Sequence, residues 1–333
     1  MIARRPRPRA VVLTAPGLAP PAALDALSDD LDVEVVHAAG LADALPGAQV
    51  LLLWDFFSSA VQDAWGQADT LEWIHVAAAG VDSLLFPDLQ RSPVTVTNAQ
   101  GVFDRPIAEF VLASVLAHGK RLHESMSLQR QHRWEHRETT SLQGQRVLVV
   151  GTGGIGREIG RLLRAVGCEV RGAGRREVAD DPDLGTVVRS DALVEHVGWA
   201  DHVVNAAPLT PQTRRLLDGT VFAAMRPGAH VVNVGRGASL VEEDLLAALR
   251  SGHLGGASID VVEEEPLPAD SALWDAPGLV VSAHLSGDVV GWRDTLAEQF
   301  VANARRWLAG EALTGVVDKE LGYVPRSTGQ ERA

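Results

Sequence analysis

The chain has 333 residues, of which 46% are hydrophobic and 22% charged, which is enough for one large core or two of ordinary size. Its net charge of -13, with no basic run beyond the opening RRPRPR, argues against a nucleic-acid or anionic-membrane partner and favours a small molecule. Cys168 is the only cysteine, which excludes an intrachain disulfide and a CxxC site and suits a reducing cytoplasm, where we expect the protein.

Short β-branched runs alternate with Ala- and Leu-rich helical patterns in the first hundred residues, as in a parallel sheet covered on both faces. The expected strands lie at 10–14, 33–38, 49–54, 73–78 and 94–98. A long helical pattern then begins near Asp104, a possible N-cap, with Pro106 in its first turn. We interpret the polar stretch 129–144 that follows as a connector.

A second α/β series begins at Arg146 and runs to about His284. Its expected strands lie at 146–150, 169–173, 202–207, 229–234, 256–261 and 279–283. The last helical pattern, in residues 294–310, has no strand after it, so it could close back onto the first domain. The fold class is therefore α/β, with two doubly wound domains.

A glycine-rich turn follows the first strand of the second series. Gly151, Gly153 and Gly156 form G-x-G-x-x-G, in which the glycines allow a tight turn, backbone approach to a pyrophosphate and close helix–strand packing. The following helix begins at Gly154 and Ile155, whose N–H groups and positive dipole end suit phosphates. Glycine-rich turns also occur for purely structural reasons, but this strand–turn–helix context indicates dinucleotide binding.

The residues after the next strand bear on the choice of cofactor. An NAD site usually has Asp or Glu here to bind the ribose hydroxyls, whereas this chain continues from Gly174 with Arg175 and Arg176. Guanidinium groups bind a 2′-phosphate through charge-assisted hydrogen bonds. We therefore expect NADP(H), with NAD(H) possible, because the arginines could be a solvated strand end and Glu177 could bind a ribose.

Three further residues follow strands of this series: Arg236 in HVVNVGRGASL, Glu265 in GASIDVVEEEPLP and His284 in LVVSAHLSGD. Ligands bind at the carboxyl ends of strands in open parallel sheets. Each residue alone also has a structural interpretation. Arg236 could cap a turn, Glu265 is one of three successive glutamates, and His284 could be a structural histidine.

Together these stretches resemble the D-isomer-specific 2-hydroxyacid dehydrogenase family. The motifs AAAGVDSL, TNAQGVFDRPIAEFVLA, LQGQRVLVVGTGGIGREIG, APLTPQTRRLLD, FAAMRPGAHVVNVGRG and PGLVVSAH occur in the family's order and cover most of the chain. The resemblance implies a Rossmann cofactor domain at 104–289, inserted into a flavodoxin-like substrate domain made of 1–103 and 290–333. It also implies a homodimeric enzyme that reduces a small 2-oxo acid to the D-2-hydroxy acid.

The resemblance also assigns roles to residues. Arg236 would bind the substrate carboxylate and polarise the carbonyl, His284 would give a proton to the carbonyl oxygen, and Glu265 would pair with the imidazole. The backbone of Ala79 and Gly80 would hold the substrate carboxylate as well. The further cofactor contacts that it implies are Pro208, Thr213 and Asp260.

Two departures from the family's pattern concern specificity. The arginine pair resembles the glyoxylate and hydroxypyruvate reductase branch, so we expect substrates of that kind. After His284 the chain continues with Leu285-Ser286-Gly287-Asp288, where many members have small residues and then threonine, so the substrate stays open. The alternatives are a phosphite-type anion dehydrogenase on the same scaffold and a nucleotide-sensing, corepressor-like binding protein.

The remaining motif suggests a metal site that we do not expect. HRWEH at 132–136 fits H-x-x-E-H, a zinc-peptidase signature that needs an apolar-faced helix, but its flanks are polar and it lies in the connector. Trp134 could instead shape an interface or a substrate pocket. We expect Cys168 to fill the core, and no apolar run approaches the length of a membrane span.

Overall fold

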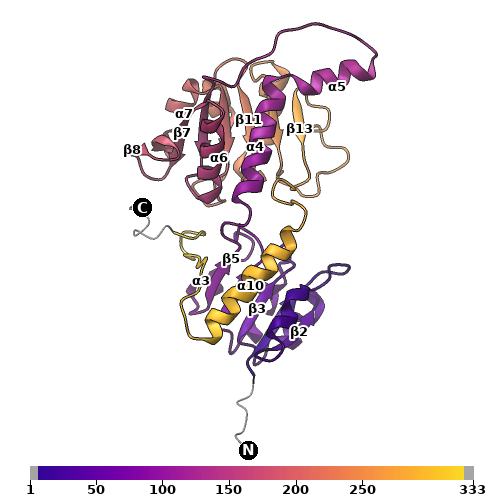
Figure 1. The fold of residues 1–333 in the computed structure, drawn as a ribbon, viewed down its shortest axis with the longest axis vertical. Helices are drawn as coiled ribbons and strands as arrows, with labels where there is room; N and C mark the ends of the chain where they lie inside the picture. Colours follow the sequence, from indigo (N-terminus) through magenta and orange to yellow (C-terminus); the bar gives the residue numbers. More distant parts are fainter. Residues whose placement is uncertain (1–6, 326–333) are drawn as a thin grey trace, which may run out of the picture. The chain divides into compact units, whose positions relative to one another are not determined.

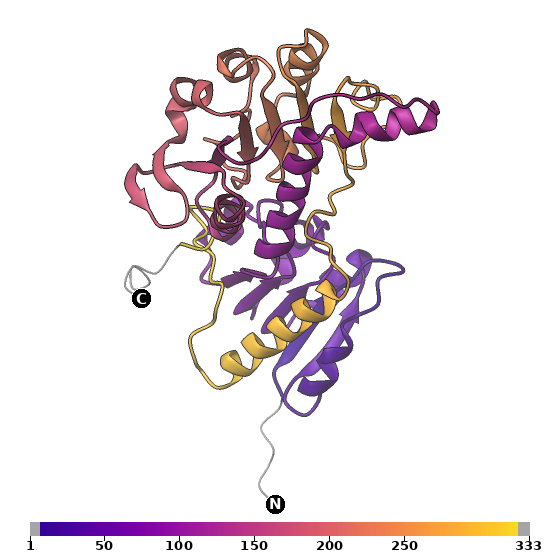
Figure 2. The same cartoon turned by 45° about the horizontal axis from the view of Figure 1, so that its top comes forward.

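The computed structural model describes residues 7–325, which form two compact units (Figures 1 and 2). The first unit contains residues up to 102 together with those from 290 onward, and the second contains residues 103–289. The first unit is thus discontinuous in sequence. The α/β fold class predicted from the sequence is confirmed, because each unit is built on a largely parallel sheet flanked by helices.

The first unit's sheet, within the described residues, has five parallel strands in the order β2-β1-β3-β4-β5. Its strands are β1 (Arg9–Leu13), β2 (Asp32–Val36), β3 (Val50–Leu53), β4 (Trp73–Val76) and β5 (Thr95–Asn98), and its helices are α1 (Leu41–Ala44), α2 (Ala60–Ala64), α3 (Pro87–Arg91) and α10 (Trp292–Leu308). β3 and β4 are buried throughout, as expected for parallel strands covered on both faces. Helix α10 returns to this sheet, where Phe300 stacks on Trp73 with ring centroids 5.3 Å apart.

The second unit's sheet has, in the part of the chain described, eight strands in the order β13-β12-β11-β10-β6-β7-β9-β8, all parallel except β8. The strands are β6 (Arg146–Val150), β7 (Glu169–Gly174), β8 (Val178–Asp181), β9 (Gly185–Arg189), β10 (His202–Asn205), β11 (His230–Asn233), β12 (Gly256–Ile259) and β13 (Leu279–Val281). The helices are α4 (Asp104–Gly119), α5 (Leu122–Arg130), α6 (Gly154–Ala165), α7 (Leu193–His196), α8 (Gly219–Ala224) and α9 (Glu242–Arg250). Helices α4 and α6 pack side by side on one face, while α7, α8 and α9 share an apolar core with the strands (Figure 1).

The predicted strands lie within a few residues of the observed ones, but the hairpin of β8 and β9 was not predicted. Its first strand is exposed except at Asp181, so it carries no apolar alternation that periodicity could detect. Asp104 as N-cap is wrong, because the helix already begins at that residue and Phe103 occupies the cap position. The Asp104 carboxylate lies against Gly154, at the start of α6.

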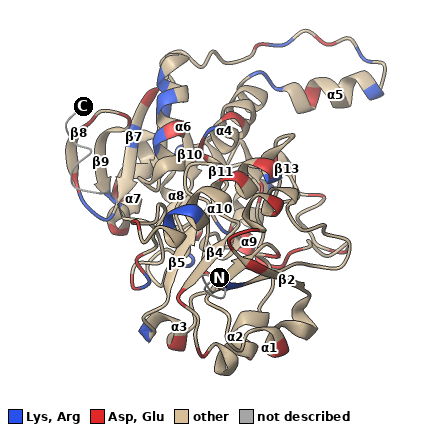
Figure 3. Ribbon diagram, turned by 60° about the horizontal axis from the view of Figure 1, so that its bottom comes forward, with Lys and Arg blue, Asp and Glu red and all other residues tan. Residues whose placement is uncertain are grey.

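Residues 122–141 form an arm that extends from the body of the second unit (Figures 1 and 2). Helix α5 occupies its first half and includes the first two residues of the predicted connector, and the rest has no regular secondary structure. Charged residues of both signs lie along it (Figure 3). The H-x-x-E-H segment lies in this non-helical part, so its histidines lack the helix that the zinc motif requires.

The remaining expectations concern single features. The Cys168 side chain is buried, burial raises the pKa of its thiol, and the Sγ–H points to the Leu142 carbonyl oxygen at 3.5 Å. A neutral, buried thiol is a poor nucleophile, as predicted for a core residue. Of the helices in the described part of the chain, none combines the length and the apolar character that a bilayer span needs.

Candidate active site

Arg236, Glu265 and His284 follow three neighbouring strands of the second unit. Arg236 comes after β11, Glu265 after β12 and His284 after β13. The register pairs Asn233 with Ile259 and Ile259 with Val281, so the three strands end at the same level. The predicted trio therefore lies at one edge of the sheet, at the carboxyl ends of its strands.

His284 and Glu265 form a hydrogen-bonded pair. The imidazole Nδ1 lies 2.8 Å from Oε2 of Glu265, whose Oε1 accepts the backbone N–H of Val262 at 3.1 Å. Burial alone would raise the pKa of Glu265, but the bonds from His284 and Val262 and the nearby charge of Arg236 lower it below its ordinary value. The carboxylate is therefore ionised at neutral pH, which fixes the hydrogen on Nδ1 and leaves Nε2 for proton exchange.

The backbone holds His284 in an unusual conformation. Its φ of 51° is in the left-handed region, which non-glycine residues rarely adopt. Residues held in such rare conformations cluster at functional sites. The residue's N–H donates to the Asp260 carbonyl oxygen at 2.8 Å. Asp260 also anchors the following loop, because its buried carboxylate accepts the Ser282 hydroxyl at 2.6 Å and the N–H groups of Leu285 and Ser286, each at 3.0 Å. The structure thus gives Asp260 a role that sequence reasoning missed, and its predicted cofactor contact stays a prediction.

Arg236 is held by a network of buried amides that sequence reasoning also missed. Asn233 donates its Nδ2–H to the Arg236 carbonyl oxygen, and it accepts from Asn205 at 2.9 Å. Ser239, which accepts from the same Asn205 side chain at 2.6 Å, donates its hydroxyl to the Arg236 carbonyl oxygen. The turn also needs glycine at Gly237, where a Cβ would lie 1.9 Å from the Val262 carbonyl group. The signal for this network was available in the sequence, since β10 and β11 both read HVVN.

The predicted cofactor glycines have surroundings that suit a dinucleotide. A Cβ on Gly151 would meet the Ala206 carbonyl oxygen at 2.7 Å, and one on Gly156 would meet the Gly151 carbonyl oxygen at 1.9 Å. At Gly153, by contrast, no heavy atom of the described residues lies within 4 Å of the Cβ position, so a phosphate can approach the backbone there. Gly154 and Ile155 open α6, and the cap position before them is Gly153, which has no side chain that could cover the helix end. This open helix N-terminus fits a pyrophosphate.

Two further predicted cofactor residues lie in the loop after β10, the strand next to β6. Thr213 donates its hydroxyl to the Pro208 carbonyl oxygen at 2.6 Å, which closes this loop. The loop is thus at the same carboxyl edge as the glycine turn. Its contact with a cofactor stays a prediction.

Arg175 and Arg176 lie exposed directly after β7. Gly174 before them packs on the glycine-rich turn, because a Cβ there would lie 2.8 Å from the Thr152 Cγ2 atom. A side chain at Gly174 would therefore need Thr152 to move. Gly174 is the position at which NAD sites usually have a carboxylate, and in this chain the Thr152 side chain occupies the space that a side chain there would need. Arg175 and Arg176 come directly after it.

Ala79 and Gly80 belong to the first unit, in the loop after β4, whereas the trio belongs to the second. Asn98, at the end of β5, donates its Nδ2–H to the Ala79 carbonyl oxygen. Because the C=O and N–H of a trans peptide point in opposite directions, this bond turns the Gly80 N–H away from Asn98. Asn98 thereby orients the N–H group predicted to hold the substrate, a role that sequence reasoning missed.

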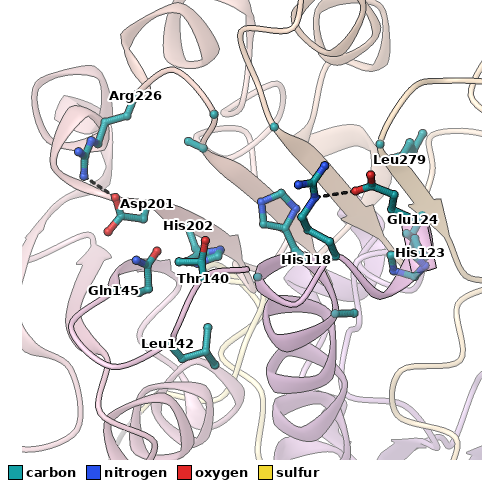
Figure 4. Close-up of a pocket in the computed structure, with 18 of the residues that line it drawn as sticks. His118, His123, Glu124, Thr140, Leu142, Gln145, Asp201, His202, Arg226 and Leu279 are labelled. Carbon is teal, nitrogen blue, oxygen red and sulfur yellow. Dashed lines mark hydrogen bonds and ion pairs between the residues drawn. The ribbon is translucent and has the colours of Figure 1, made fainter. Parts of the chain in front are cut away.

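The cavity shown in Figure 4, of about 600 Å³, lies away from the trio, where the strands of the second unit's sheet begin. Arg226 pairs with Asp201 on its rim, and Arg121 pairs with Glu124 at 2.6 Å. Its floor includes His118 and His202, in contact with the buried His230. Desolvation by burial lowers the pKa of all three imidazoles, that of His202 to about 4. None of these residues belongs to the predicted catalytic set.

Comparison with known proteins places the chain among dehydrogenases. Residues 112–286 match the family model of the D-isomer specific 2-hydroxyacid dehydrogenase NAD binding domain. Glyoxylate/hydroxypyruvate reductase A of Photorhabdus laumondii is 32% identical over 263 residues, 76% of this chain and 82% of that protein. The (S)-sulfolactate dehydrogenase of Chromohalobacter salexigens is 33% identical over 70% of this chain and 76% of its own.

Solved structures of dehydrogenases align with the chain over most of its length. The NADPH-dependent glyoxylate/hydroxypyruvate reductase of Sinorhizobium meliloti, in complex with NADP and sulfate, aligns with a TM-score of 0.81 at 27% identity, over 96% of this chain and 100% of that one. A D-isomer specific 2-hydroxyacid dehydrogenase of Xanthobacter autotrophicus, in complex with NADPH and MES, aligns with a TM-score of 0.80 at 31% identity, over 94% and 99%.

Proposed function

The chain belongs to the D-isomer specific 2-hydroxyacid dehydrogenase family, whose members are NAD(P)-dependent enzymes, and from this premise we propose that it is an NADPH-preferring reductase of small 2-oxo acids such as glyoxylate and hydroxypyruvate. The observation that carries the proposal is the pair of His284 Nδ1 and Glu265 Oε2 at 2.8 Å, with Arg236 after the adjacent strand. A proton donor and a carboxylate-binding guanidinium are what reduction of a 2-oxo acid requires.

The reaction adds a hydride and a proton to the 2-oxo acid. The reduced nicotinamide, when bound, supplies the hydride to the carbonyl carbon. Arg236 binds the substrate carboxylate with its planar fork and polarises the carbonyl. His284, oriented by Glu265, donates the proton on Nε2 to the carbonyl oxygen, and in the reverse direction Nε2 takes a proton back. The Gly80 N–H group supplies a further contact to the carboxylate.

The preference for NADPH rests on the end of β7. Arg175 and Arg176 are exposed there and can meet a 2′-phosphate, while Thr152 closes the position at which a ribose-binding carboxylate would stand. The two aligned dehydrogenase structures from Sinorhizobium and Xanthobacter, which hold NADP and NADPH, support the same choice. NADH would still bind through the glycine turn, with lower affinity.

A second class of substrate has support among the relatives. The (S)-sulfolactate dehydrogenase relative favours one second candidate, a 2-oxo acid that carries a sulfonate. A panel of glyoxylate, hydroxypyruvate, pyruvate and 3-sulfopyruvate, followed by the absorbance of NADPH and NADH in parallel, tests both. We expect the highest kcat/KM with NADPH and glyoxylate or hydroxypyruvate.

Two alternatives are tested beside this panel. One is a phosphite-type dehydrogenase on the same scaffold, for which phosphite and NADP⁺ are added, and the other is a nucleotide-sensing binding protein of a different class. Reduction of NADP⁺ by phosphite would indicate the phosphite-type dehydrogenase. Tight NADPH binding without turnover of any 2-oxo acid would indicate the corepressor-like sensor, and it would overturn the proposed reductase.

We also propose that the enzyme is a homodimer formed through the arm, residues 122–141. The arm presents apolar side chains to solvent: Trp134 is fully exposed, and Leu122 and Met126 are half exposed. A second copy of the chain would cover them. Light scattering should give twice the chain mass for the wild type and a shift to the monomer for Trp134→Asp. A monomeric wild type would contradict this proposal.

A cytoplasmic location is the last part of the proposal. Its support is the single, buried cysteine, which precludes intrachain disulfides and suits a reducing compartment. Fractionation of the source cells, with antibody detection of the native protein, tests it.

A further inference from the structure

Arg157 directly follows the glycine motif, yet its guanidinium is committed to protein groups. The residue is 7% exposed and forms a two-pronged ion pair with Asp181, with both Nη–Oδ distances at 2.6 Å. Its Nη1 also donates to Asp183 at 3.1 Å, and its Nε donates to the Thr152 carbonyl oxygen at 3.1 Å. These bonds use four of the five N–H donors of the side chain. Figure 3 shows the basic residues along α6, of which Arg157 is the buried one.

Asp181 is the residue that anchors β8 to the rest of the unit, whereas β9 is held by its pairing with β7 and by the buried Val187. The other residues of β8 are exposed, so no apolar side chain of that strand anchors it. The Asp181 carboxylate also accepts the N–H groups of Asp183 and Leu184, at 3.0 and 3.1 Å, which closes the hairpin turn. Burial would raise the pKa of Asp181, but the bonds from Arg157 and from these N–H groups lower it. The pair is therefore ionised and directional, and it fixes the position of β8, the strand that follows residues 175–177.

The hairpin in turn bounds the arginine loop, residues 175–177, which connects β7 to β8. Strand β9 pairs with β7, with Gly174 opposite Arg189. The Arg189 Nη1 donates to the Arg175 carbonyl oxygen at 3.3 Å. A loop of three residues between two fixed strands has few conformations, so the position of the hairpin determines where Arg175 and Arg176 point.

The same guanidinium reaches the other half of the cofactor site. The carbonyl that its Nε binds belongs to Thr152, in the glycine turn between Gly151 and Gly153. The Thr152 side chain packs against Gly174, the residue before the arginine loop. Arg157 therefore joins the glycine turn to the hairpin that bounds the arginine loop, through one planar group.

From this geometry we propose that Arg157 is a positioning residue for cofactor selectivity, which holds the arginine loop at a fixed place relative to the glycine turn through its pair with Asp181. The inference rests on the proposed preference for NADPH. It concerns the 2′-phosphate alone, because NADH lacks the group that the loop would contact.

The test compares Arg157→Lys with Arg161→Lys by titrating NADPH and NADH into the protein and following nicotinamide fluorescence, without any 2-oxo acid. Lysine keeps the charge but cannot reproduce the fork or the bond to the Thr152 carbonyl oxygen. We expect the Kd for NADPH to rise about tenfold, the effect of one lost charge-assisted hydrogen bond, while the Kd for NADH changes less than about threefold. Arg161 is the matched control, because it lies one turn further along α6 and contacts Glu158 and Asp183 with a half-exposed side chain. Its substitution should leave the ratio of the two Kd values unchanged.

A second variant covers the case in which Arg157→Lys does not fold. Asp181→Asn keeps the size of the side chain, removes its charge and leaves Asp183 as partner of the guanidinium, and it should lower the preference for NADPH in the same way. In the double variant the two effects should not add, since both act through one pair. Circular dichroism at the titration temperature verifies that each variant is folded.

The outcomes separate this inference from the proposed function. A wild type that binds NADH as tightly as NADPH overturns both. A wild type that prefers NADPH, with Arg157→Lys or Asp181→Asn folded and its Kd ratio unaltered, overturns the positioning role alone. Equal losses for both cofactors would show a merely structural role and would overturn it as well.

Discussion

Asn205 donates its side-chain amide to Asn233 at 2.9 Å, and the two residues end neighbouring strands with the same sequence, HVVN. Because the strands are parallel and in register, each repeated residue stands beside its equivalent. At the carboxyl edge the asparagines hold the backbone of Arg236. At the amino edge the two histidines meet, with Nδ1 atoms 3.3 Å apart. One short repeat thus supports the candidate active site at one end and the cavity of Figure 4 at the other.

The first prediction concerns the asparagine network. Asn233→Ala should lower kcat/KM for the 2-oxo acid about tenfold or more, because displacing a substrate-positioning group slightly has effects of that size. The Kd for NADPH should change little. Ser258→Ala is the matched control, since it removes from the interior of β12 a buried polar partner of His230, which lies at the amino edge of the same sheet. Steady-state kinetics measures kcat/KM for both variants. A wild-type kcat/KM in Asn233→Ala would contradict the role of the asparagine network.

The second prediction concerns the proton donor. His284→Asn should reduce kcat by about 10²–10⁴-fold, the usual contribution of general acid catalysis. Asparagine is chosen because it tolerates the left-handed backbone that His284 adopts, so a loss of activity reports the imidazole and not the loop. Cofactor titration serves as the control and should give the wild-type Kd. An undiminished kcat would remove His284 from the mechanism.

The third prediction concerns the arginine pair. Replacing both residues, Arg175→Ala/Arg176→Ala, should raise the Kd for NADPH by about 10²-fold and leave the Kd for NADH nearly unchanged. Two charge-assisted contacts are lost, and the expected size allows for the exposure of these contacts to solvent. The effect should shrink as salt is raised. Equal losses for the two cofactors, measured by nicotinamide fluorescence, would show that the arginines do not contact the 2′-phosphate.

The fourth prediction concerns a reversal of the preference from NADPH to NADH, which requires substitutions at both Gly174 and Thr152. Gly174→Asp alone would place a Cβ 2.8 Å from the Thr152 Cγ2, so Thr152→Ala must accompany it. In the background without the arginines, this pair of changes should favour NADH, because the new carboxylate accepts from the ribose hydroxyls and repels a phosphate. Thr152→Ala alone is the control and should keep the wild-type preference.

The sequence predicted those parts of the fold that depend on apolar patterning. Buried runs such as the one ending at Val150 mark parallel strands, and the polar residues that follow them, Arg236 among them, mark the carboxyl edge. Asp104 was misplaced because capping residues and first-turn residues have similar preferences, and only the backbone angles separate them. The β8–β9 hairpin was not predicted because β8 is exposed and is anchored by an ion pair, and the partner of a charged residue cannot be inferred from periodicity.

The same reasoning explains which parts of the site were missed. Asn205 and Asn98 bond partners that are 19 to 34 residues away in sequence, which no spacing rule connects, and the repeated HVVN was the one sign that Asn205 and Asn233 act together. The trio was predicted because each member follows a strand and matches a family motif. Ala79 and Gly80 lie in the other unit, so their part in binding the substrate stays a prediction.

The last prediction concerns the stability of the protein in acid, which buried histidines should limit. His75 is fully buried in the first unit, among Trp73 and Phe300, and desolvation lowers its pKa to about 3. Its Nδ1 lies 2.8 Å from the Thr97 hydroxyl, whereas its Nε2 has no partner among the described residues. The folded protein therefore holds this imidazole neutral, and an added proton would have no acceptor.

The sign of the effect follows from the two states. In the unfolded chain His75 titrates with a pKa of about 6.5. Above that value both states are neutral and the residue contributes no pH dependence. As the pH falls from about 6.5 towards about 3, the unfolded chain binds a proton that the folded protein does not. The free energy of unfolding should therefore fall by about 1.4 kcal/mol per pH unit for this one residue.

His75→Leu, of similar volume, tests this by removing the titrating group from the core. Its free energy of unfolding in urea is measured between pH 7 and pH 4.5. Below about pH 6.5 it should fall less steeply than that of the wild type, by the roughly 1.4 kcal/mol per pH unit that one bound proton contributes. His202 should add to the acid sensitivity of the second unit in the same manner, since burial lowers its pKa to about 4. His136→Gln, in the exposed arm, is the control and should keep the wild-type slope. If His75→Leu keeps that slope as well, then His75 is protonated in the folded protein and the packing around it must admit water.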